Sequence, residues 1–326
     1  METNNSRQAA WVAMGSLFSF GFSIVSSMIL SRYFDKADYG TYKQVMYVYN
    51  TLLTVFTLGL PKAYSYFLPR VNPQEAKDLI NKITRLFFLL GGVFSILLFL
   101  GASLIAQFLK NPDLEIALRY FSLVPFLMLP TMGLEGILST YKKTKFLAGY
   151  TITTRLFMLC CVALPVMIFN LDYIGAIIGF VIASIFSAFL ALYLKVYPVR
   201  NNIKNRTQTS YKEIFQFSLP LMYASLWGVL MSSADQFFIS RFFGLEVFAD
   251  FSNGSMELPF VGMIVGACST VLSPIFSRMS HEKVNLYEQS YPLWKSVYQK
   301  TALLIYPIVA VSYTHLRAHE TRGNLV

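Results

Sequence analysis

Long apolar stretches follow one another along this chain, separated by short polar connections. Most are close to the roughly 20 residues that a helix needs to cross a bilayer at about 1.5 Å per residue. Backbone groups in lipid must form their hydrogen bonds within the protein, which long apolar segments achieve as helices. Apolar and polar residues do not alternate as they would in the strands of a membrane barrel, so we predict helices. The predicted spans are Ala9–Leu30, Val45–Leu60, Leu86–Leu109, Tyr120–Leu138, Phe146–Phe169, Tyr173–Leu194, Ile214–Ile239 and Phe251–Phe276, with a shorter ninth segment at Thr301–Val311.

Lysine and arginine are distributed unequally between the connections. The even-numbered connections are rich in both, the odd-numbered ones are poorer, and the fifth, Asn170–Asp172, has neither. Because positively charged loops stay on the cytoplasmic side, we expect the N-terminus and the even connections to be cytoplasmic. Lys36 and Lys43 are assigned to the first connection and Lys195 to the sixth.

Composition agrees with a membrane protein. Hydrophobic residues make up 55% of the 326 residues and charged residues only 13%, more apolar surface than a soluble domain can cover. The net charge of +10 belongs to membrane edges, where anionic headgroups attract basic side chains, so we expect no nucleic-acid partner. The three cysteines lie within spans and suggest neither disulfides nor a metal site, and we expect no cofactor.

Two helix ends share a pattern that suggests an internal repeat. Ile29–Phe34 and Phe238–Phe243 close the first and seventh spans with an aliphatic-Ser-Arg-aromatic-Phe pattern. An offset of six spans gives a parallel repeat of two bundles, although interface anchoring alone also produces such short matches. We predict a complete N-terminal six-helix bundle over residues 1–200 and the start of a second, truncated bundle over residues 201–311.

The last residues differ in composition from the rest of the chain. The apolar run that ends at Val311 is too short to span a bilayer, and two of the three histidines follow it, at His315 and His319. We predict that residues 312–326 are a non-native tail on a truncated protein, the alternative being a genuine polar C-terminus. We therefore base no metal site on these histidines.

Four stretches, taken together and in this order, resemble one membrane protein family. The resemblance is to the oligosaccharide flippases of the polysaccharide-export branch of the MATE-like (MOP) superfamily, and it extends from about Ser6 to Val311. That family usually has more spans than this chain. The stretches are Leu30–Tyr42, Leu58–Arg70, Gly136–Phe146 and Asp235–Gly244.

The resemblance implies a fold and a function. The fold would be an all-α polytopic MATE-like bundle in the bacterial cytoplasmic (inner) membrane, with its first bundle complete and its second incomplete. The protein would not be an enzyme. It would move undecaprenyl-diphosphate-linked oligosaccharide repeat units to the outer leaflet by alternating access, for lipopolysaccharide or exopolysaccharide biosynthesis. Coupling would be to protons or sodium, and the partners would include membrane lipids, a polysaccharide polymerase and glycosyltransferases.

Other functions remain open from the sequence. A drug/cation antiporter or a lipid-II flippase of the same superfamily would have the same spans. A membrane glycosyltransferase or polymerase is less favoured, because such enzymes need sizeable outer loops and the odd connections here are short. A structural membrane scaffold is a further alternative.

Arg155 is the main candidate for substrate binding. It lies nine residues into the fifth span, about 13 Å deep at the helical rise. A charge there costs about 2.5–3.5 kcal/mol or more, which marks it as functional, and its planar guanidinium suits a diphosphate. The alternative is a structural ion pair with Glu135 on the preceding helix.

The remaining candidates are three acidic residues and two arginines. Asp235 and Glu257, on the seventh and eighth spans, could take up a proton or Na⁺ for ion coupling, and Glu135 is a weaker candidate for the same role. Hydrogen bonding between helices is the alternative for the first two. Arg32 and Arg241 either anchor helix ends or guard the outer mouth as further substrate-binding residues.

Overall fold

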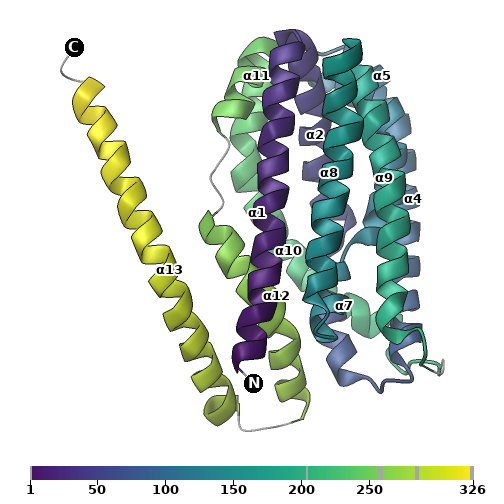
Figure 1. Ribbon diagram of the computed structural model, residues 1–326. Coiled ribbons are helices and arrows are strands. Elements are labelled where there is room, and N and C mark those ends of the chain that lie inside the picture. Colours follow the sequence, from purple (N-terminus) through teal and green to yellow (C-terminus); the bar gives the residue numbers. More distant parts are fainter. Residues whose placement is uncertain (1, 203–204, 256–259, 283–285, 324–326) are drawn as a thin grey trace.

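The computed structural model describes residues 2–202, 205–255, 260–282 and 286–323, and within these ranges it is helical with no strand (Figure 1). The α-helices are α1 Glu2–Tyr33, α2 Lys36–Phe56, α3 Pro61–Phe67, α4 Ala76–Phe108, α5 Asp113–Phe121, α6 Leu123–Met128, α7 Leu134–Thr140, α8 Thr144–Phe169, α9 Tyr173–Val196, α10 Tyr211–Phe242, α11 Leu245–Gly254, α12 Phe260–His281 and α13 Leu286–Gly323. Three short 3-10 helices are η1 Leu68–Arg70, η2 Leu129–Thr131 and η3 Tyr197–Val199.

Seven helical segments in the described part of the chain are long and apolar enough to cross a bilayer. They correspond to the predicted spans except the second and the ninth, and the eighth is shifted to Gly262–His281. The second falls on α2, which carries Lys43, Gln44 and Asn50 and is therefore less apolar. The prediction of a multi-pass helical membrane protein is confirmed.

Two predicted spans are divided rather than continuous. The fourth forms α5, α6, η2 and α7, and Pro125 of α6 and Pro130 of η2 lie within it, where proline supplies no backbone N–H to a helix. Gly133 precedes α7 as its N-cap with a φ of 76°, a conformation that glycine adopts readily, and a Cβ there would overlap the ring of Tyr64. The eighth predicted span is not one continuous helix, because α11 ends at Gly254 with Ser255 as its C-cap, and the apolar segment long enough to cross a bilayer is Gly262–His281.

The N-terminal helices pack around an aromatic core. Tyr49 and Phe56 of α2 stack on Phe94 of α4 with ring centroids 6.0 and 4.3 Å away. On the other side, α1 lies along α8, and α8 lies along α9 (Figure 1). The α8–α9 contact is close at Gly179, where a Cβ would overlap the Cys161 carbonyl.

The helix bounds agree with the predicted repeat. α1 and α10 are both 32 residues long, and Arg32 and Arg241 are each the penultimate residue of their helix. The next helix begins four residues after each arginine. α13 runs through the predicted ninth span and continues without a break into the predicted tail as far as Gly323, the last described residue. The domain limits and the origin of the tail stay predictions.

We name the two ends of the bundle by their charge. The basic end holds the even connections, including the turn after α7, and lies at the bottom of Figure 1 with the N-terminus. The opposite end holds the turns after α1, α4, α8 and α10.

Candidate functional site

Two adjoining hollows lie between the helices and share part of their lining; we call them the two chambers of the central cavity. The inner chamber, about 420 Å³, lies within the N-terminal bundle and is lined by α1, α2, α8 and α9. Its charged lining residues are Lys43 and Arg155, both basic. Asn50, the serines of α1 and several methionines supply much of the remaining wall, so the chamber combines positive charge with neutral hydrogen-bonding groups.

The second chamber, about 690 Å³, lies between the N-terminal bundle and the helices that follow it. Asp235 and Gln236 of α10 line it, opposite α2. Lys43, Met46 and Asn50 border both chambers. One face of α2 therefore separates a basic chamber from one that holds a carboxylate.

Lys43 was missed as a site residue by the sequence reasoning, which placed it in the first connection. The structure corrects this assignment, because α2 begins at Lys36 with Asp35 as its cap, whose carboxylate accepts from Asp38 N at 2.7 Å. Lys43 Nζ donates to Ser27 Oγ at 3.1 Å. The recurrence of polar side chains at positions 43, 47 and 50 on one helical face could have indicated it.

Arg155 lies on α8 and lines the inner chamber, exposed to it. The alternative of an ion pair with Glu135 is wrong, because Glu135 lies on α7 and pairs with Lys62 at 3.8 Å. None of the hydrogen bonds or ion pairs within the described ranges involves Arg155. Its guanidinium is thus available to a ligand in the chamber.

The acidic candidates separate into different places. Asp235 lines the second chamber, and its Oδ1 accepts from Gln236 N at 2.7 Å. Ser233 lines the same chamber, whereas Asn253 accepts from the Tyr39 hydroxyl at 2.6 Å. Glu135 lines neither chamber, and Glu257 lies outside the described residues.

Arg32 and Arg241 lie at the opposite end and line neither chamber. Arg32 is exposed at the end of α1. Arg241 is half-buried, its guanidinium lies 5.5 Å from the centroid of the Phe242 ring, and its Nη1 has no hydrogen-bond partner among the described residues. The structure does not bring these two arginines to Arg155.

Contacts close the cavity region at the basic end. Arg70 donates to Ser277 Oγ at 2.9 Å, and Ser277 donates to the Tyr66 carbonyl at 2.6 Å. The ring of Tyr66 also stacks on Phe217 with centroids 4.0 Å apart. These contacts join the N-terminal bundle to α12 and α10.

A different set of contacts joins the same parts at the opposite end. Lys36 pairs with Asp250 at 2.9 Å, with both side chains more than half exposed. Gln44 Nε2 donates to Ser240 Oγ at 2.8 Å in a buried position. Both ends of the central cavity are therefore bridged in this conformation.

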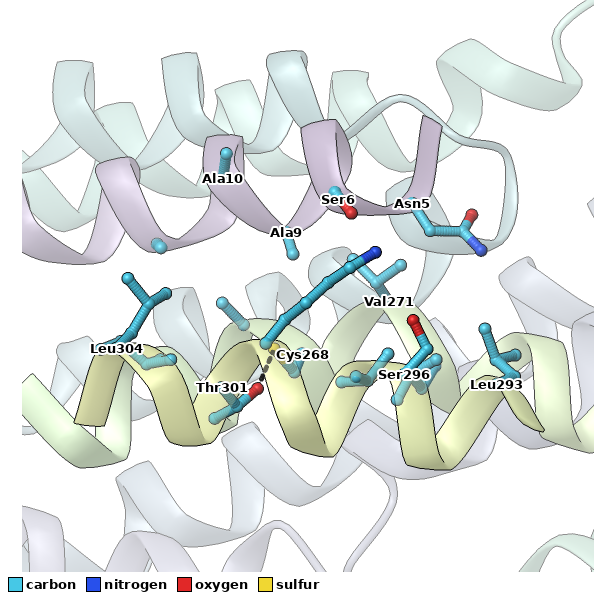
Figure 2. Close-up of a pocket in the computed structure, with 16 residues that line it drawn as sticks. Asn5, Ser6, Ala9, Ala10, Cys268, Val271, Leu293, Ser296, Thr301 and Leu304 are labelled. Carbon is cyan, nitrogen blue, oxygen red and sulfur yellow. Dashed lines mark hydrogen bonds between the residues drawn. The ribbon is translucent and has the colours of Figure 1, made fainter. Parts of the chain in front are cut away.

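A second hollow, the apolar crevice, lies between α1, α12 and α13 and has a volume of about 240 Å³. Figure 2 shows Ala9 of α1 facing Cys268 of α12 and Thr301 of α13, whose sulfur and hydroxyl lie 3.6 Å apart. It shares no lining residue with the central cavity. Its walls are mostly aliphatic, and the polar lining residues are Asn5, Ser6, Ser296, Lys300 and Thr301.

Sequence comparison decides the family. Residues 6–280 match the family described as polysaccharide biosynthesis proteins. The chain belongs to this family. A comparison with curated proteins finds no match. The family and the solved relatives are transporters rather than enzymes, and this polysaccharide biosynthesis protein is accordingly a multi-pass membrane transporter.

Solved structures show the same fold. The MATE multidrug transporter DinF-BH, solved as a complex, superposes with a TM-score of 0.78 at 15% identity, over 98% of this chain and 75% of that one. A MOP superfamily transporter from Pyrococcus furiosus gives 0.66 at 16% identity, over 95% and 74%. An outward-facing MATE family transporter gives 0.71 at 14%, over 95% and 71%. The predicted MATE-like fold is thereby confirmed.

Proposed function

We propose that this polysaccharide biosynthesis protein is a flippase for lipid-linked oligosaccharide repeat units carried on undecaprenyl diphosphate. The observation that carries the proposal is the inner chamber, where both charged lining residues, Lys43 and Arg155, are basic. A diphosphate needs cationic donors, and a guanidinium can donate two parallel hydrogen bonds to it. Asn50 and the serines of α1 add hydrogen-bonding groups that suit sugar hydroxyls.

The basic chamber also separates this proposal from the drug/cation antiporter alternative. A binding chamber for a cationic drug would place acidic groups near the ligand, because opposite charges attract strongly away from bulk water. In the described part of the chain, no acidic residue lines the inner chamber, and its two cations repel a positive ligand. A lipid-II flippase would share the diphosphate chemistry and differ only in the sugar.

Asp235 is the proposed ion-coupling residue. It lies in the second chamber, across α2 from Arg155, and both chambers border Lys43. Protonation or Na⁺ binding would neutralise the negative charge of Asp235, which lies in the same chamber as Lys43. Lys43 would then attract the diphosphate of the substrate more strongly. We place the basic end in the cytoplasm of a bacterial inner membrane, with the polymerase and glycosyltransferases as partners.

The test is complementation of a flippase-deficient strain with the full-length protein. Arg155→Ala should abolish surface polysaccharide at unchanged expression, and Arg155→Lys should restore part of it, because it keeps the charge and loses the bidentate geometry. Arg119→Ala is the matched control, since Arg119 pairs with Glu115 on the surface of α5. Normal polysaccharide in the Arg155→Ala strain would contradict the proposal.

A further inference from the structure

Lys195 is a fully buried lysine near the basic end of α9, with 1% of its surface exposed. Its Nζ donates to the Met132 carbonyl at 2.6 Å and to the Tyr64 hydroxyl at 3.1 Å. The rings of Tyr64 and Phe87 lie 4.6 and 5.3 Å from Nζ. Among the described residues no carboxylate pairs with it. A buried ammonium ordinarily requires a counter-charge, and the described part of the protein supplies none here.

A hollow of about 310 Å³, the α4–α9 hollow, adjoins this lysine. Asn81, Thr84 and Arg85 line it from α4, and Lys195 lines it from α9. The Thr84 hydroxyl forms a hydrogen bond with the Tyr64 hydroxyl at 2.8 Å, and this contact fixes the Thr84 side chain at the wall of the hollow. Both charged lining residues are basic. A phosphate group, with its negative charge and several acceptor oxygens, matches this set of donors.

The surroundings indicate where the phosphate comes from. Leu89 on α4 and Tyr193 on α9 are 62% and 58% exposed, so the helices beside the hollow present apolar side chains outward to lipid. A wider groove continues from Arg85 and is lined by Lys82 and Arg206, with Asp78 as an acidic residue in its wall. Basic pockets between membrane helices at this level are typical sites for anionic headgroups.

We propose that the α4–α9 hollow binds the headgroup phosphate of an anionic phospholipid from the leaflet at the basic end. The phosphate would contact Arg85 at the rim and neutralise the ammonium of Lys195 within the bundle. The acyl chains would lie along the outer faces of α4 and α9. The proposal holds whichever substrate the central cavity takes, and it makes the stability of the N-terminal bundle depend on the lipid.

The test uses the full-length protein in nanodiscs of phosphatidylcholine, with and without phosphatidylglycerol. Native mass spectrometry measures retained phosphatidylglycerol, and thermal unfolding measures its stabilising effect. Arg85→Gln should lower retention about tenfold, as expected for the loss of a charge-assisted contact. Lys195→Met should unfold at the same temperature as the wild type or higher in phosphatidylcholine alone, and should gain nothing from phosphatidylglycerol.

Lys77→Gln is the matched control, because Lys77 lies at the same end, donates to the Arg200 carbonyl and does not line the hollow. Wild-type retention in Arg85→Gln would overturn the proposal, and so would an equal loss in Lys77→Gln. Inorganic phosphate added in phosphatidylcholine should not raise the unfolding temperature. An increase equal to that from phosphatidylglycerol would assign the hollow to a free anion instead. If Lys195→Met does not fold, Arg85→Gln, a rim variant, still decides the outcome.

Discussion

Arg155 and Lys195 are both basic residues on membrane helices of the N-terminal bundle, and each lines a hollow, yet they differ in burial and in hydrogen bonding. Arg155 is exposed to a chamber and forms no hydrogen bond or ion pair within the described part of the chain. Lys195 is enclosed and donates to a carbonyl and a hydroxyl. Depth along a helix therefore does not assign a role to a cation. The groups around it decide whether its donors remain available to a substrate.

Charge reversal should have the largest effect at both positions, on transport at Arg155 and on folding at Lys195. Arg155→Glu should lower transport by about 100-fold or more, because charge-assisted hydrogen bonds of about 1.5–3 kcal/mol each are replaced by repulsion. Its unfolding temperature should remain that of the wild type. Lys195→Glu should instead prevent folded protein from accumulating, because a buried carboxylate would face the Met132 carbonyl. Transport assays in vesicles and thermal unfolding measure the two effects, and the same phenotype for both variants would contradict the distinction.

Gly133→Ala should have the next largest effect, on stability alone. Gly133 has a φ of 76°, and it follows Met132, whose carbonyl Lys195 contacts. Alanine would be strained at that φ and would overlap Tyr64, so we expect about 2–4 kcal/mol of destabilisation. Thermal unfolding in nanodiscs measures this loss. Gly149→Ala, at a helical site with open space around it, is the control and should not destabilise the protein.

Lys36→Gln should have the smallest effect, and it tests whether an exposed lysine with a carboxylate partner contributes to stability. Lys36 has a carboxylate partner, Asp250, but both side chains are more than half exposed. Surface ion pairs contribute about 0–1 kcal/mol, so the unfolding temperature should hardly change. A large loss of stability would show that a partner alone makes a cation structural, irrespective of burial.

The sequence predicted most of the membrane architecture. Apolar runs located the seven spanning segments, and Pro125 and Pro130 lie within the divided fourth one. Hydropathy and the missing backbone N–H of proline are properties of the residues themselves. Their effects on helices therefore do not depend on tertiary contacts and can be predicted from the sequence. The predicted residues Arg155 and Asp235 both line the central cavity, although their roles stay predictions.

The two lysines were assigned to connections for different reasons. Lys43 precedes the apolar run of its span, and only the helix cap at Asp35 extends α2 far enough to include it. That signal was present in the sequence. Lys195 follows an apolar run and looks like an ordinary loop residue. Its burial depends on the Met132 carbonyl, which the turn at Gly133 leaves free, and this tertiary contact has no sequence signature.

Direct binding tests the central claim that the inner chamber takes the diphosphate of a lipid-linked oligosaccharide. The measurement is the affinity of the purified full-length protein for an undecaprenyl-diphosphate oligosaccharide, compared between wild type and Arg155→Ala. The loss of a bidentate contact predicts affinity about 100-fold lower in the variant, with Arg119→Ala unchanged. Equal affinity in the wild type and Arg155→Ala would contradict the account.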